Sequence, residues 1–157
     1  MTLRTIARPH VVTISNAHGF AHLVRTVLQD LDVSVRTSPI AERAVRFVEQ
    51  LQPDLLIVDL VPDHETDCWL VMEALQARPS TKSIPLLLCP VVPWLLDGHQ
   101  QRLAQHRVRT WCEPFDLRDL LEQVASALDE QPAHRNAHLS LRQLDGASIS
   151  QSTGSHV

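Results

Sequence analysis

The feature that most constrains the fold of this chain is a regular alternation between short apolar runs and longer segments of helical periodicity. In the helical segments, apolar residues recur at the three- and four-residue spacing of one helix face. Such an alternation favours a parallel sheet covered by helices and joined by right-handed crossovers. The runs that predict strands are residues 10–15, 33–36, 54–59, 84–89 and 108–112.

The third of these runs, Asp54–Asp59, is apolar on both faces, which is expected of a central strand covered by helices on both sides. We therefore predict one α/β domain of five strand–helix units over residues 10–130, preceded by a short extension at 1–9. Residues 131–157 are rich in Ser, Gln, His and Asn and have few apolar residues. That composition predicts a flexible tail without a core of its own, either without function or serving as a docking segment.

Composition excludes several classes of function. Four glycines leave no room for a dinucleotide-binding fingerprint or a phosphate-binding P-loop. The net charge of −4 argues against direct contact with nucleic acid. No apolar run is long enough to span a membrane or to serve as a signal peptide. The three cysteines have no metal-ligand spacing, so we expect neither a disulfide framework nor a metal site, and a cytoplasmic location.

Chemistry in an open parallel sheet gathers beyond the carboxyl ends of its strands. In this chain the residues predicted to lie there are Ser15, Asn16, Asp59, Pro90 and Glu113. They form the candidate site.

Three segments resemble the receiver domains of two-component response regulators. Pro53–Pro62 is similar to the third strand of that family, which ends in the phosphoacceptor aspartate. Ile84–Cys89 is similar to the fourth strand, and Glu113–Leu117 to the Lys-Pro-Phe signature before the last helix. The resemblance implies a flavodoxin-like fold with three layers, α/β/α, and five parallel strands in the order 2-1-3-4-5.

The resemblance also implies a phosphorylation site, from which this sequence departs. Receivers hold Mg²⁺ with two acids after the first strand and with the acceptor itself, and they bind the phosphoryl group with a hydroxyl and a lysine. At the matching positions this chain has Ser15 and Asn16 for the acids, Pro90 for the hydroxyl and Glu113 for the lysine. Only Asp59 is retained, which is why we expect a degenerate pseudo-receiver.

Other positions depart from the pattern too. Thr110 stands where many receivers carry an aromatic switch residue, and Cys68 stands where they usually carry a glycine, in a loop that we expect to be one residue longer. Lys82 is the only lysine, and it precedes the fourth strand, at the wrong end of the sheet to replace the missing cation.

The size of these losses argues against phosphotransfer. A charge-assisted hydrogen bond contributes about 1.5–3 kcal/mol and a metal ion several more. Their joint loss should remove well over ~5 kcal/mol of transition-state stabilisation, or roughly four orders of magnitude in rate. Glu113 would in addition repel a phosphoryl group.

Several candidate residues have alternative interpretations. Asp59 could order a loop as a hydrogen-bond acceptor, remain a phosphoacceptor, or contact another ligand. The acidic loop, which adds Asp63, Glu65 and Asp67, could hold a hard cation or simply be solvated. His18 and His22 lie one helical turn apart but have no third ligand. Cys89 and Cys112, at the ends of neighbouring strands, are expected to be buried and inert.

One apolar segment suggests a protein partner. Residues 91–96 are apolar without interruption and lie at the expected start of the fourth helix, predicted around Leu95–Gln105. Trp94, Leu95 and Leu96, with Trp111 on the edge strand, could form an interface on the face of the fourth helix, fifth strand and fifth helix. Through that face the chain would bind a protein partner or a second copy of itself. Trp94 and Leu95 could instead belong to the core.

The sequence thus predicts a stand-alone receiver-like signalling module, not an enzyme and without a cofactor, that works through protein–protein contacts independently of aspartyl phosphorylation. Two alternatives stay open. One is a phosphorylatable single-domain response regulator with Asp59 as its acceptor. The other is a flavodoxin-like protein that binds a small ligand.

Overall fold

A five-stranded parallel sheet forms the centre of the computed structural model, which describes residues 8–90, 92–112 and 116–130. The strand order is β2-β1-β3-β4-β5, as expected. The predicted extension falls largely, and the predicted tail entirely, outside the described residues, as does Glu113. The strands are β1 (His10–Ile14), β2 (Ser34–Ser38), β3 (Leu55–Leu60), β4 (Leu86–Pro90) and β5 (Arg109–Thr110).

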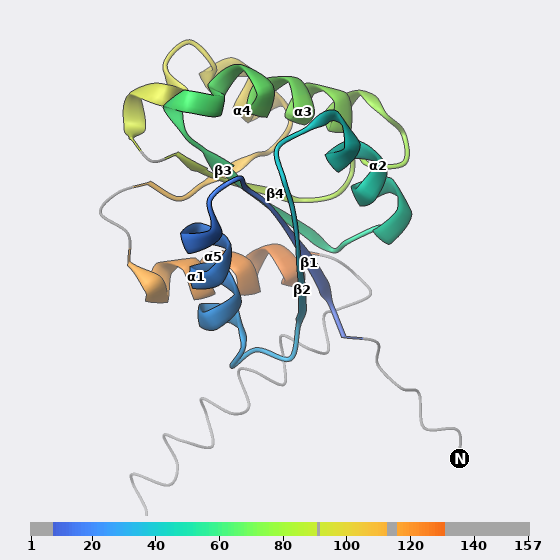
Figure 1. The fold of residues 1–157 in the computed structure, drawn as a ribbon, viewed down its shortest axis with the longest axis vertical. Helices are drawn as coiled ribbons and strands as arrows, with labels where there is room; N and C mark the ends of the chain where they lie inside the picture. Colours follow the sequence, from blue (N-terminus) through green and yellow to red (C-terminus); the bar gives the residue numbers. More distant parts are fainter. Residues whose placement is uncertain (1–7, 91, 113–115, 131–157) are drawn as a thin grey trace, which may run out of the picture.

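Helices cover both faces of the sheet, so the molecule has the three layers that the alternation predicts (Figure 1). Two of them lie on one face, α1 (His18–Leu28) and α5 (Leu117–Asp129). The opposite face carries α2 (Glu42–Leu51), α3 (Glu65–Ala77) and α4 (Gln100–Gln105). Short 3₁₀ turns, η1 (Pro62–His64) and η2 (Pro93–Leu96), follow β3 and β4.

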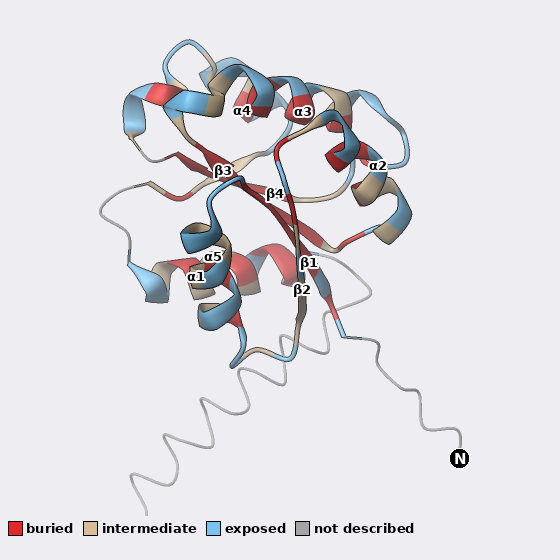
Figure 2. Ribbon diagram, in the orientation of Figure 1, coloured by how far each residue is buried: buried red, intermediate tan, exposed pale blue. Residues whose placement is uncertain are grey.

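The central position of β3 in the sheet explains why its sequence is apolar except at Asp59. Its side chains alternate between the two faces, and every residue of β3 is buried (Figure 2). Leu55 and Ile57 pack with α1 and α5, whereas Leu56 and Val58 pack with α2 and α3. The core is therefore divided into two halves by the sheet, and β3 contributes to both.

The structure corrects two local expectations. The segment predicted as one helix around Leu95–Gln105 is divided into η2 and α4. Gly98 separates them at a φ of 81°, a left-handed conformation that glycine adopts without strain. Cys68 lies within α3 and is fully buried, so it is not part of a lengthened loop.

Candidate functional site

The predicted site lies where β1 and β3 end side by side. The two strands are parallel neighbours, with Ile14 opposite Val58, so the next residues of each, Ser15 and Asp59, lie together. The Ser15 hydroxyl donates a hydrogen bond of 2.8 Å to Oδ2 of Asp59. Asp59 is only 2% exposed and Ser15 is also buried. The retained carboxylate is thus enclosed and bound to a side chain of its own protein.

The Ser15 hydroxyl is itself fixed by the turn that leads into α1. The backbone N–H of Ala17 donates to Ser15 Oγ at 3.0 Å, and the backbone N–H of Ser15 donates to the carbonyl of Ser38 on β2. The hydroxyl proton also lies within reach of the carbonyl of Ala17, at 3.4 Å, but Asp59 at 2.8 Å is the closer acceptor. The local backbone therefore orients Ser15 towards the carboxylate.

Burial dominates the electrostatics of this site. Desolvation raises the pKa of Asp59, and the hydrogen bond from Ser15 and the nearby His64 lower it only in part. Two buried thiols flank the carboxylate. Burial, together with the charge of Asp59, raises the pKa of Cys68 to about 12 and that of Cys89 further still. Both cysteines are therefore neutral, poorly nucleophilic thiols at neutral pH, which was the expectation for Cys89. Cys112, which was expected to be buried as well, is partly exposed.

Asn16 makes a structural contact. It stands at the second of the two positions that carry acids in receivers. Its Oδ1 accepts a hydrogen bond of 2.7 Å from the backbone N–H of Ile40, in the loop between β2 and α2. The side-chain oxygen is thereby committed to a loop on the β2 side of the sheet. Asn16 itself is exposed, unlike Ser15.

The remaining positions of the site come from β4 and the segment after β5. Pro90 is the last residue of β4, is buried, and lies opposite Leu60 of β3. It has neither a hydroxyl nor an N–H to offer a ligand. Lys82 precedes β4 and is exposed, so it lies at the opposite edge of the sheet, as predicted. Glu113 falls outside the described residues.

The residues present do not fit the magnesium ion that the receiver resemblance implies. Mg²⁺ prefers several oxygen ligands that include carboxylates, whereas among the described residues of the predicted site Asp59 is the one carboxylate, beside the hydroxyl of Ser15 and the engaged amide of Asn16. Among the described residues, no three His, Cys, Asp or Glu side chains are grouped closely enough to hold a metal. This also holds for the pair His18 and His22 and for Asp63, Glu65 and Asp67, which the structure places in η1 and the first turn of α3 and not in a loop.

The predicted partner surface is smaller than the sequence suggested. Trp94 is 57% exposed on η2, and Leu96 is partly buried. Leu95 and Trp111, however, are only 1% and 2% exposed, so including them in an interface was wrong. Leu95 packs into the core on the α2–α3 side, and Trp111 packs on the α1–α5 side. An apolar run does not reveal which of its members point inward, which is why Leu95 was grouped with Trp94 and Leu96; its place in the core is the alternative that the sequence left open. Trp111 was added because the edge strand was expected on the same side.

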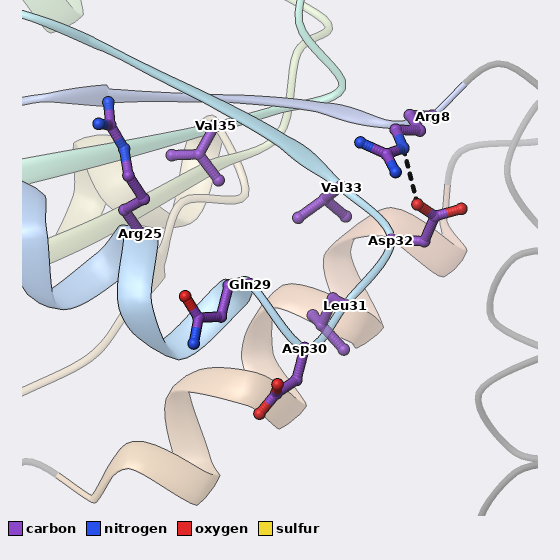
Figure 3. A pocket seen from close by; sticks show the side chains of 8 residues that line it. All are labelled: Arg8, Arg25, Gln29, Asp30, Leu31, Asp32, Val33 and Val35. Carbon is purple, nitrogen blue, oxygen red and sulfur yellow. Dashed lines mark ion pairs between the residues drawn. The ribbon is translucent and has the colours of Figure 1, made fainter.

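Two hollows lie along α1. The larger, about 790 Å³, opens beside Ser15 and Asn16 and is lined by His18, His22 and Arg25, with no acidic residue. The smaller, about 470 Å³, lies at the turn between α1 and β2 and carries charges of both signs (Figure 3). An exposed ion pair of 2.7 Å joins Arg8 and Asp32 there, which contributes little to stability. Neither hollow contains Asp59.

Comparison with solved structures identifies the architecture. The chemotaxis response regulator CheY4 of Vibrio cholerae superposes with a TM-score of 0.65 at 16% identity, over 77% of this chain and 99% of that one. The chain has the receiver fold. The receiver domain of a histidine kinase from Syntrophus aciditrophicus gives 0.66 at 19% identity, over 79% and 92% of the two chains. A receiver-modulated diguanylate cyclase from Pelobacter carbinolicus superposes with a TM-score of 0.61 at 20% identity, over 82% of this chain and 98% of that one.

At these identities the likeness concerns the receiver fold and not the chemistry of the site. No family model matches the sequence, and no curated protein matches it. Among the described helices, none is long and apolar enough to cross a membrane. What the receiver fold provides is the placement of Asp59 at the end of the central strand, where receivers carry their acceptor.

Proposed function

We propose that this protein is an atypical receiver-like signalling module that acts through protein–protein contacts without phosphorylation of Asp59. The observation that carries the proposal is the buried hydrogen bond between Ser15 and Asp59. A phosphoacceptor must meet a phosphoryl donor and a metal ion, whereas this carboxylate is 2% exposed and bonded inward. Its raised pKa also lowers the fraction of the anion that could attack phosphorus.

The surface around Trp94 is the proposed contact with a separate protein. An exposed tryptophan beside the partly buried Leu96 and Val92 offers a large apolar side chain on a firm base, because the neighbouring Leu95 is anchored in the core. Trp94 follows β4, on the same edge of the sheet as Asp59. A partner that binds at Trp94 could therefore recognise the conformation of this edge without any phosphoryl group.

The phosphorylation test uses acetyl phosphate, and separately beryllofluoride, each with Mg²⁺, on the wild type and on Asp59→Asn. Amide NMR spectra and intact mass are recorded for both proteins. We expect neither a mass gain of one phosphoryl group nor shifts confined to residues near Asp59 in the wild type. A stoichiometric, Mg²⁺-dependent acyl phosphate that Asp59→Asn abolishes would establish the alternative, a phosphorylatable response regulator.

The partner test compares three tagged proteins as baits: wild type, Asp59→Asn and Trp94→Ala. Asp59→Asn is expected to recover the same partner in the same amount, and Trp94→Ala is expected to lose it. Because Trp94 is mostly exposed, its replacement should leave the far-UV circular dichroism unchanged. Equal recovery by all three baits contradicts the assigned surface.

A further inference from the structure

The larger of the two hollows along α1 has basic side chains in its wall and no acid among its described residues. It measures about 790 Å³ and lies between the start of α1 and the end of the edge strand β2. We name it the α1–β2 hollow. His18, His22 and Arg25 line it, and their spacing of four and three residues places them on one side of α1. Arg25 provides a permanent positive charge, and each imidazole provides an N–H.

The charge of Arg25 is not balanced within the described part of the chain. Arg25 forms no ion pair with any described residue. It also lines the smaller hollow, which contains Asp30 and Asp32, but Asp32 is paired with Arg8. Figure 3 shows the side chain of Arg25 directed away from both of these acids. An anion in the α1–β2 hollow would provide the opposite charge that Arg25 lacks.

The start of α1 adds backbone donors to the same hollow. Ala17, in the N-cap position, and His18, the first helical residue, both line it. Ala17 provides no side-chain hydrogen bond, and the first turn of α1 contains no acid. The first N–H groups of the helix are therefore available to a ligand, and the helix dipole favours a negative charge there. Side-chain and backbone donors thus border one volume.

Two buried hydroxyls lie on the sheet side of the hollow. Thr37 of β2 lines the hollow, and Thr13 of β1 stands opposite Thr37 in the parallel register, on the same face of the sheet. Thr13 is completely buried, and neither Oγ1 atom has a hydrogen-bond partner among the described residues. A buried hydroxyl without a partner costs free energy. A ligand oxygen that accepts from Thr37 would provide a partner and leave the Thr37 oxygen as an acceptor for Thr13.

We propose that the α1–β2 hollow binds a small molecule that carries a phosphate group. A phosphate has three strong acceptor oxygens, and the hollow presents donors from α1, from its side chains and from Thr37. Small-molecule sites measure about 300–1,000 Å³, so this one has room for an organic part beside the phosphate, against Ala21 and Pro39. A nucleic acid would need an extended basic surface, which a net charge of −4 argues against. The proposal does not depend on the protein contacts around Trp94.

The first test titrates phenyl phosphate into the full chain without Mg²⁺, at constant ionic strength, and follows the amide NMR spectrum. We expect saturable shifts concentrated at residues 15–22 and 37–39. Inorganic phosphate lacks the ring and should bind at least about threefold more weakly. Benzoate, which carries a carboxylate on the same ring, should bind at least about tenfold more weakly.

The second test changes the basic side chains of the hollow. Arg25→Gln, and separately the double variant His18→Gln with His22→Gln, should each raise the dissociation constant of phenyl phosphate by at least about tenfold. Arg43→Gln is the matched control, because Arg43 is an exposed arginine that lines a hollow of about 370 Å³ containing two glutamates. It should leave the dissociation constant unchanged. All four side chains are exposed, so circular dichroism should show that each variant stays folded.

The third test isolates the hydroxyl of Thr37. Thr37→Val removes the hydroxyl at nearly constant volume and should weaken phenyl phosphate severalfold, whereas Thr37→Ser keeps it and should bind like the wild type. Because the hydroxyl has no partner among the described residues, Thr37→Val should not lower the free energy of unfolding. A loss of binding in both variants would attribute the effect to the shape of β2 and not to the hydroxyl.

Four results would overturn the proposed site. The absence of saturable shifts at residues 15–22 and 37–39 excludes it. Benzoate that binds as tightly as phenyl phosphate excludes phosphate as the ligand class, and inorganic phosphate that binds equally well excludes an organic part. Equal losses from Arg25→Gln and Arg43→Gln would attribute binding to non-specific attraction. Shifts from this hollow need no Mg²⁺ and should persist in Asp59→Asn, which distinguishes them from an acyl phosphate at Asp59.

Discussion

The two helical layers of this protein differ in which apolar residues they bury and which they expose. On one face, α1 and α5 bury a single stripe each, for example Val24 and Leu28 on α1, and present mostly polar or partly buried residues outward, apart from the exposed Leu117 at the first position of α5. On the other face, α3 buries residues on successive sides and still exposes Leu70. Both layers cover the same sheet with similar cores, so the demands of folding do not explain the difference.

The difference teaches that the apolar residues of this chain contribute unequally to folding, and that their burial decides how much each contributes. Those facing the sheet stabilise the fold, because apolar surface removed from water contributes about 25 cal/mol per Å². Leu70 removes little surface from water within one chain and can contribute much only when something covers it. Substitutions on the two layers should therefore affect different measurements.

The largest expected effect comes from the core beneath α5. Leu120 is completely buried, so Leu120→Ala removes buried surface and leaves a cavity. We expect a loss of about 2–5 kcal/mol in the free energy of unfolding, measured by urea titration. A loss well under ~1 kcal/mol would mean that α5 packs far more loosely on the sheet than described.

The next effect concerns Asp59, between the two layers. Because its pKa is raised in the folded protein, the folded state keeps its proton to higher pH than the unfolded chain does. Stability should therefore fall as pH rises from the unfolded value of 3.8 through the raised value. Asp59→Asn cannot ionise, so its free energy of unfolding should rise relative to that of the wild type as the pH increases towards neutral.

Urea titrations of the wild type and Asp59→Asn between about pH 4 and about pH 7 check this prediction. The two proteins should differ least at the acidic end. An advantage of Asp59→Asn that is the same at every pH would attribute the effect to packing and not to the charge.

A similar or smaller effect is expected at the helix ends of the α1–α5 layer. The Asp116 carboxylate accepts a hydrogen bond of 2.9 Å from the backbone N–H of Arg118 and caps α5. Asp116→Ala should cost about 1 kcal/mol in thermal or urea unfolding. Helix α1 begins at His18, and Ala17 in its N-cap position provides no side-chain hydrogen bond, so Ala17→Ser should stabilise the protein slightly. If Asp116→Ala and Ala17→Ser changed the free energy of unfolding in the same direction and by the same amount, the two cap assignments would be contradicted.

The smallest effect on folding is expected at Leu70. Leu70→Ala should change the free energy of unfolding of the monomer by less than about 0.5 kcal/mol, in contrast to Leu120→Ala. A loss as large as that of Leu120→Ala would assign Leu70 to the core.

The architecture could be predicted from the sequence because each strand and helix carries its own period. The doubly apolar run that ends in Asp59 predicts a central strand, and the structure places β3 in the middle of the sheet. The break at Gly98 was not predicted, because apolar spacing alone does not distinguish one helix from a 3₁₀ turn followed by a shorter helix. Cys68 was misplaced for a related reason, since the start of α3 has no strong apolar period.

The candidate site could be predicted in position but not in detail. Parallel strands place Ser15 and Asp59 at one edge, so their proximity follows from topology. Their hydrogen bond does not, because it depends on how the turn at Ala17 orients the Ser15 hydroxyl. Leu95 and Trp111 were assigned to a surface because side-chain direction in a short 3₁₀ turn or beyond a two-residue strand has no readable period.

The enclosed thiols have a practical consequence for studying this protein. With the thiols of Cys68 and Cys89 protonated and shielded, maleimide reagents at neutral pH should modify mainly Cys112, which is partly exposed although burial raises its pKa as well. Replacing that single cysteine by serine would create a background nearly silent to labelling. A fluorophore or spin label could then be attached at any chosen surface position, and distances between labels could be measured in solution.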